Sequence, residues 1–94
     1  MSKPHTTISA DDVLDGLLRS AERLEKRVAE GTDVEALRAE LDVIRQEIRE
    51  VRQAKGTGRA TYEGERAGDG TLRFQILDGS WWKIRPNGKV TRDG

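Results

Sequence analysis

The sequence predicts an α+β protein, in which a heptad-patterned αα-hairpin or coiled coil precedes a small antiparallel β-meander of three or four strands. Apolar residues recur at alternating steps of three and four through residues 9–54, as they do on one face of an amphipathic helix. Eight of the ten glycines then lie at or after position 56, between short stretches of alternating apolar and polar residues. We therefore expect a helical assembly region at 9–54, a linker at 55–58 and the meander at 59–94.

The chain before the first helix shows no periodicity. Residues 1–8 are polar with an early proline, so we expect a flexible N-terminal arm in which Ile8 is the only anchor. Ser9 then offers a hydroxyl N-cap, and Asp11 and Asp12 place carboxylates in the first turn, where they satisfy free N–H groups and oppose the helix dipole. A helix is predicted to start at Ser9.

The apolar periodicity breaks at Gly31, which separates two helical stretches. Thr32 and Glu35 have the spacing of a capping box, in which each side chain bonds to the backbone N–H of the other residue. A second helix is therefore predicted to run from Asp33 to about Ala54.

Six apolar positions of the second helix follow one another without a polar interruption, which is the strongest signal in the chain. Charged residues such as Glu47 flank this stripe, on faces that we expect to be solvated. Two arrangements fit: a hairpin folded at Gly31, which we favour, or a continuous kinked helix that associates with other copies. Because a narrow seam usually faces another narrow seam, we expect hairpins to pair into a homodimer or a larger assembly, with packing inside one chain as the alternative. The predicted seam residues are Leu14, Leu17, Leu24, Val28, Val34, Leu37, Leu41, Ile44, Ile48 and Val51.

Four stretches of the glycine-rich half are predicted as strands. In the second of them, Leu72, Phe74 and Ile76 alternate onto one face. Asp78-Gly79 and Pro86-Asn87-Gly88 have the residues that tight turns require. A meander of this size is not stable alone, so we expect it to pack on the helices or on another copy. The predicted strands are 59–65, 71–77, 80–85 and 89–92.

Composition narrows the classes of function. The 17 basic and 17 acidic residues cancel, which argues against a general polyanion binder, although residues 55–94 carry a balance of +3. The absence of cysteine excludes disulfides, thiolate metal sites and cysteine nucleophiles, and it fits a cytoplasmic protein. No stretch has the pattern of a signal sequence or the length of an apolar membrane span.

No set of catalytic residues is evident. The single histidine, His5, lies in the expected arm, so neither a Ser-His-Asp triad nor a multi-histidine metal site is predicted. Asp11-Asp12-Val13-Leu14-Asp15 resembles the Asp-Asp-x-x-Asp string by which prenyl-diphosphate synthases hold magnesium. The chain lacks their second acidic motif, and dipole compensation at the helix N-terminus explains all three aspartates. We therefore expect no enzymatic activity, no metal and no cofactor.

The adjacent tryptophans Trp81 and Trp82 mark the candidate binding surface. Neighbouring side chains of a strand point to opposite faces, so Trp82 is expected in the core if it shares a face with Ile84. Trp81 then lies on a face that is aromatic and cationic, suited to stacking on a base or to anchoring a protein interface. Burial of both tryptophans is the alternative. The residues of this candidate binding face are Arg73, Trp81, Lys83 and Arg85.

These features favour a non-enzymatic, homo-oligomeric interaction or adaptor protein that assembles through its helices and presents the aromatic-cationic face to a protein partner. Its small size and high charge are typical of bacteriophage and mobile-element products that attach to virion or host machinery. One alternative is a small-ligand, nucleotide or nucleic-acid binder that uses Trp81 and the nearby cations, although a balance of +3 is small for duplex DNA. The other is a structural component of a virion or scaffold.

Overall fold

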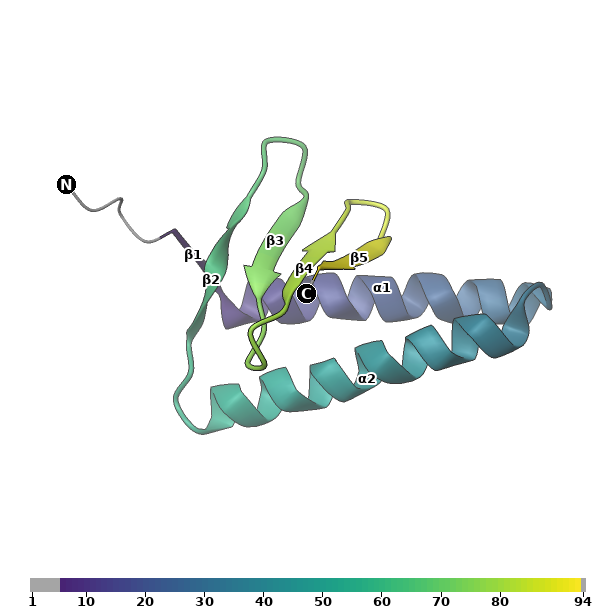
Figure 1. Ribbon diagram of the computed structural model, residues 1–94, viewed down its shortest axis with the longest axis horizontal. Helices are drawn as coiled ribbons and strands as arrows, with labels where there is room; N and C mark the ends of the chain where they lie inside the picture. The colour runs from purple at the N-terminus through teal and green to yellow at the C-terminus, as the bar shows by residue number, and fades with distance from the viewer. Residues whose placement is uncertain (1–5, 94) are drawn as a thin grey trace.

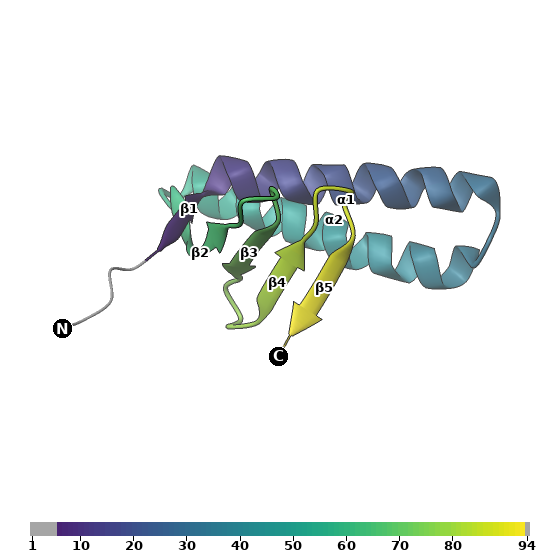
Figure 2. The ribbon, with the colours of Figure 1, turned by 90° about the horizontal axis from the view of Figure 1, so that it is seen from above.

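The computed structural model describes residues 6–93 and has two layers, a helical hairpin and an antiparallel sheet on one of its sides (Figures 1 and 2). The sheet crosses the half of the hairpin that is distant from its loop, and the loop end extends beyond the last strand (Figure 1). The α+β fold with a helical hairpin is therefore confirmed. The elements in chain order are β1 (Thr7–Ser9), α1 (Ala10–Glu30), α2 (Val34–Gly56), β2 (Thr61–Arg66), β3 (Leu72–Gln75), β4 (Trp81–Ile84) and β5 (Val90–Asp93).

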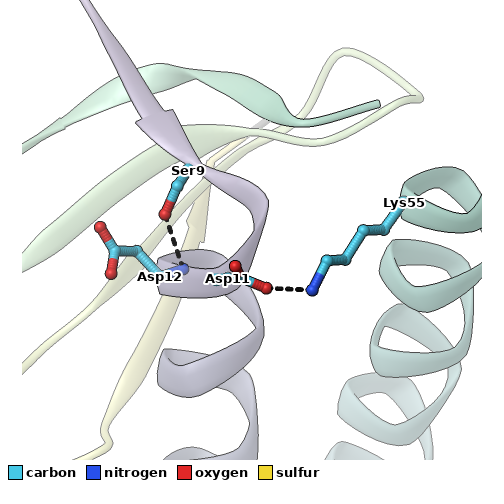
Figure 3. Close-up of polar contacts among 4 residues, drawn as sticks. All are labelled: Ser9, Asp11, Asp12 and Lys55. Carbon is cyan, nitrogen blue, oxygen red and sulfur yellow. Dashed lines mark hydrogen bonds and ion pairs between the residues drawn. The ribbon is translucent and has the colours of Figure 1, made fainter. Parts of the chain in front are cut away.

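The two helices begin differently. Ser9 caps α1 as predicted, because its Oγ accepts a hydrogen bond of 3.1 Å from the backbone N–H of Asp12 (Figure 3). The capping box expected for α2 does not form: Asp33 is the N-cap, in a left-handed conformation with φ 52°, and its side chain makes no capping hydrogen bond. Gly31, at φ 83°, ends α1 and starts this tight reversal.

The heptad seam packs α1 against α2 inside one chain. Leu17 and Val51 are fully buried and Leu41 is 4% exposed, while Leu14 and Val28 pack at the margin of the same core. The hairpin arrangement that we favoured thus packs most of the seam inside one chain, whereas Val34, at the start of α2, is only partly buried and lies outside this core. Other members of the seam that are buried here are Leu24, Leu37, Ile44 and Ile48.

The sheet has one strand more than the sequence predicted. Residues 1–8 were expected to form an arm, but Thr7–Ser9 pairs antiparallel with β2, and Ile8 is buried opposite Tyr62. The remainder of that arm, residues 1–5, lies outside the described residues. Within residues 6–93 the strand order is β1-β2-β3-β4-β5, each neighbour antiparallel, so the four predicted strands form a meander to which the N-terminal strand adds an edge.

Three turns of the meander are built alike, at intervals of nine residues. In the β3–β4 turn, Asp78 Oδ1 accepts from the Ser80 N–H at 2.8 Å, and Gly79 takes φ 93°. In the other two turns, Asp69 Oδ1 accepts from the Thr71 N–H and Asn87 Oδ1 accepts from the Lys89 N–H. The sequence predicted two of these turns, from Asp78-Gly79 and Pro86-Asn87-Gly88, but not that Asp69-Gly70 starts a series of three similar turns.

The sheet and the helices share one hydrophobic core, with the closest approach at Gly16 of α1. A Cβ placed there would lie 2.9 Å from Leu72 Cδ1 and 3.3 Å from Ile84 Cδ1, so a glycine lets α1 approach β3 and β4. The buried Ser20 hydroxyl donates a 2.6 Å hydrogen bond to the carbonyl of Gly88, which fixes the β4–β5 turn to α1. The sequence predicted that the meander packs either on the helices or on another copy. In the structure it packs on the helices.

Candidate functional site

The four residues of the candidate binding face lie together on the outer side of the sheet, away from the helices. Arg73 of β3 is the register partner of Lys83 of β4, and Trp81 lies one pleat away on the same side. The Arg73 guanidinium stands 4.5 Å from the centre of the Trp81 ring, at cation–π distance. Arg85 follows β4 and lines the same shallow hollow, of about 170 Å³.

The two tryptophans divide as the alternation of a strand predicts. Trp82 is 3% exposed and packs against Phe74, with ring centres 6.4 Å apart, on the side that faces the helices. Trp81 is only partly buried and lies on the outer side. Within one chain, therefore, Trp82 is buried and Trp81 is not packed against the helices; burial of Trp81 against a second copy stays a prediction.

The electrostatics of this outer face are unbalanced. Arg73 and Lys83 are directly opposite each other, an arrangement of like charges that weakens the pairing of two strands. Within residues 6–93 no ion pair joins either side chain to a carboxylate. Arg85 contributes, after the hydrogen bonds from Thr71, to the lowered pKa of Asp69. The face thus presents two cations that form no ion pair within residues 6–93, although Glu65 is the register partner of Arg73 on its other side.

The acidic N-terminus of α1 has a structural role. Asp11 forms an ion pair with Lys55, which joins the start of α1 to the end of α2 (Figure 3), and Asp12 pairs with Arg66 Nη2 at 3.0 Å. Among residues 6–93, no group of three or more histidine, cysteine or acidic side chains is arranged to hold a metal. His5 lies outside the described residues.

A second surface, a groove between α2 and the sheet, was not foreseen. Two adjoining hollows of about 560 and 750 Å³ share the residues Glu47, Glu50, Ile76 and Asp78, so they form one continuous depression beside the β3–β4 turn. Figure 1 shows this turn reaching down towards α2. The sheet contacts mainly α1, which leaves this side of α2 open.

Glu47 is the unusual residue of this groove. It was expected on a solvated flank of the seam, but it is only 7% exposed. Burial, and after it the hydrogen bond and negative charge of Glu50 and the charge of Asp78, raise the pKa of Glu47 from 4.5 to about 7. The available signal was its position three residues after Ile44 and four before Val51, which places it on the buried stripe.

Comparison with known proteins adds no relationship to this geometry. No family model, no curated protein and no solved structure matches the chain. Neither α1 nor α2 contains an apolar stretch of the length that a bilayer crossing requires. The chemistry of the two surfaces is therefore the basis for the proposals below.

Proposed function

We propose that this chain is a non-enzymatic interaction protein, and that the outer face formed by Arg73, Trp81, Lys83 and Arg85 binds an acidic segment of a partner protein. The observation that carries the proposal is the register pair of Arg73 and Lys83, two cations held opposite each other that form no ion pair with any carboxylate of residues 6–93. An acidic partner would relieve their repulsion. Trp81 beside them supplies a rigid aromatic surface of the kind that dominates binding energy at protein interfaces.

A nucleotide or single-stranded nucleic acid fits this face less well. Base stacking needs an open aromatic ring face, and the Arg73 guanidinium already covers one face of Trp81 at 4.5 Å. Asp93, the register partner of Trp81, and Glu65, that of Arg73, bring negative charge close to either ligand, so the covered ring face is what separates the two. We therefore favour a protein partner, whose spaced carboxylates can meet the two cations individually.

Self-association stays a prediction, with a changed physical basis. The seam is occupied inside one chain, so a dimer would have to form through another surface. Static light scattering gives the mass in solution: a monomer of 10.5 kDa contradicts the predicted assembly, and a multiple of that mass supports it. Leu41→Asp does not serve this test, because Leu41 lies in the core of the single chain.

The indole N–H resonance of Trp81 provides a direct test of the proposed face. An acidic peptide of alternating aspartate and leucine, titrated into the ¹⁵N-labelled protein, should shift this resonance and leave the backbone amides of α2 near Glu47 nearly unchanged. Affinity should fall steeply as salt rises and fall about tenfold in Lys83→Ala. Lys26→Ala is the matched control, because it removes the same charge from a distant, exposed position on α1. Equal loss of affinity in both variants, or no shift of the Trp81 indole, contradicts the proposal.

A further inference from the structure

The groove between α2 and the sheet has the dimensions of a peptide site. Its lining on α2 runs from Asp42 to Thr57, which corresponds to about 22 Å along the helix axis. An extended segment of about seven residues has this length. The opposite wall is formed by the β3–β4 turn and by Arg92 and Asp93 of β5.

The centre of the groove is acidic and lacks a cation. Glu47, Glu50 and Asp78 line both hollows, and within residues 6–93 no ion pair joins any of the three to a lysine or arginine. The basic residues of the lining lie outside this shared centre: Arg92 belongs to one hollow, where it stacks 5.7 Å from the Trp82 ring centre, and Arg59 to the other, 5.3 Å from the Tyr62 ring centre. The central carboxylates therefore face the groove without compensation.

The groove also offers apolar surface beside these carboxylates. Ile76 and Trp82 form part of its wall, and two large side chains at its margin are unusually open, Leu77 at 55% and Val43 at 37% exposure. A surface that combines exposed apolar side chains with uncompensated carboxylates is complementary to a segment with alternating basic and apolar residues.

We propose that this groove is a second binding site, occupied by a basic, amphipathic segment of a partner protein. Lysine or arginine head groups of that segment lie against Glu47, Glu50 and Asp78, and its apolar side chains contact Leu77, Val43 and the wall beneath them. This site lies on the helix side of the sheet and does not rest on the binding face proposed above. Together the two sites would make the chain an adaptor for two partners of opposite charge.

A basic peptide of alternating lysine and leucine, about seven residues long, tests this site. Titrated into the ¹⁵N-labelled protein, it should shift the Trp82 indole and the backbone amides of α2 near Glu47, while the Trp81 indole stays nearly unchanged. The double variant Glu50→Gln with Asp78→Asn should weaken binding by at least about tenfold, since it removes two central carboxylates and leaves only Glu47, whose pKa is raised to about 7. The matched control is Glu22→Gln with Glu35→Gln, which removes the same charge from exposed positions on the two helices.

Three outcomes overturn the proposal. The first is equal affinity of the control and groove variants, which means that the peptide binds by net charge alone. The second is tight binding of the acidic peptide in the groove, seen as shifts of the backbone amides of α2 near Glu47. The third is that the protein is a dimer in which a second copy already fills the groove. In that case the double variant of Glu50 and Asp78 would have the mass of a monomer while the natural protein has the mass of a dimer. The Trp81 indole and the backbone amides of α2 near Glu47 report the two sites separately, because Trp81 lines only the outer hollow and Glu47 only the groove. Failure of this site is therefore distinguishable from failure of the outer face.

Discussion

Replacement of Glu47 by glutamine removes a carboxylate that the fold buries next to two other carboxylates. The folded-state pKa of Glu47 is raised from 4.5 to about 7, so the folded protein holds this proton more tightly than the unfolded chain. The stabilisation of the folded state that this bound proton provides is complete below pH 4.5 and is lost as pH rises towards 7. Between these values the free energy of unfolding of the natural protein should therefore fall.

The size of this effect follows from the shift. A difference of about 2.5 pKa units corresponds to at most roughly 3 kcal/mol at pH 8. Glutamine keeps the shape and helix propensity of glutamate and can donate a hydrogen bond to Glu50. We expect Glu47→Gln to raise the free energy of unfolding by about 1–3 kcal/mol at pH 8 and to change it little at pH 4.5.

Urea unfolding followed by circular dichroism at several pH values between 4.5 and 8.5 measures this difference directly. Glu22→Gln is the control: it removes an exposed charge paired with Lys26 at 3.7 Å and should cost about 0.3–0.5 kcal/mol. The reasoning about burial is refuted if the stability gained by Glu47→Gln does not grow with pH, or if the natural protein becomes more stable relative to this variant above pH 6.

Three further substitutions test the fold, all by urea unfolding. Ser20→Ala leaves the buried carbonyl of the β4–β5 turn without its donor and should cost about 1–3 kcal/mol; a loss below a few tenths would mean that this turn is not fixed to α1. Gly79→Ala should cost about 1–2 kcal/mol because of its φ of 93°, whereas Gly68→Ala, at a position without that constraint, should be nearly neutral. Leu41→Asp should unfold the chain, because it places a charge in the core. Val43→Asp, two residues away and 37% exposed, should leave the chain folded. A similar loss of stability in both variants contradicts the hairpin.

Local patterns predicted the parts of the fold that depend on neighbouring residues. The three-four spacing from Val34 to Val51 was enough to locate α2 and its buried face, and strand alternation was enough to place Trp82 inside if it shared a face with Ile84. The capping box failed because Asp33 adopts a left-handed conformation, so the chain reverses too tightly for Thr32 to act as the cap.

The features that were missed are set by contacts between distant segments. The three residues Thr7–Ser9 are too few for a periodic signal, and they become a strand only because β2 provides the backbone partners. The groove exists because the sheet packs mainly on α1 and leaves one side of α2 open. No short stretch of sequence predicts this arrangement of the sheet and the two helices. Glu47 was visible on the apolar stripe, yet only the tertiary structure places Glu50 and Asp78 beside it.

The zero net charge of the chain now has a different meaning for its partners. At the level of composition it argued against binding to polyanions, but the charges are separated in space: Arg73 and Lys83 lie opposite each other on the outer face, and Glu47, Glu50 and Asp78 gather in the groove. Attraction over distances near the Debye length of about 8–10 Å depends on the local surface and not on the sum. A neutral protein of this kind should therefore lose affinity for both an acidic and a basic peptide as the salt concentration rises. If binding relied on apolar contact alone, the affinity for each peptide would stay nearly constant as salt rises.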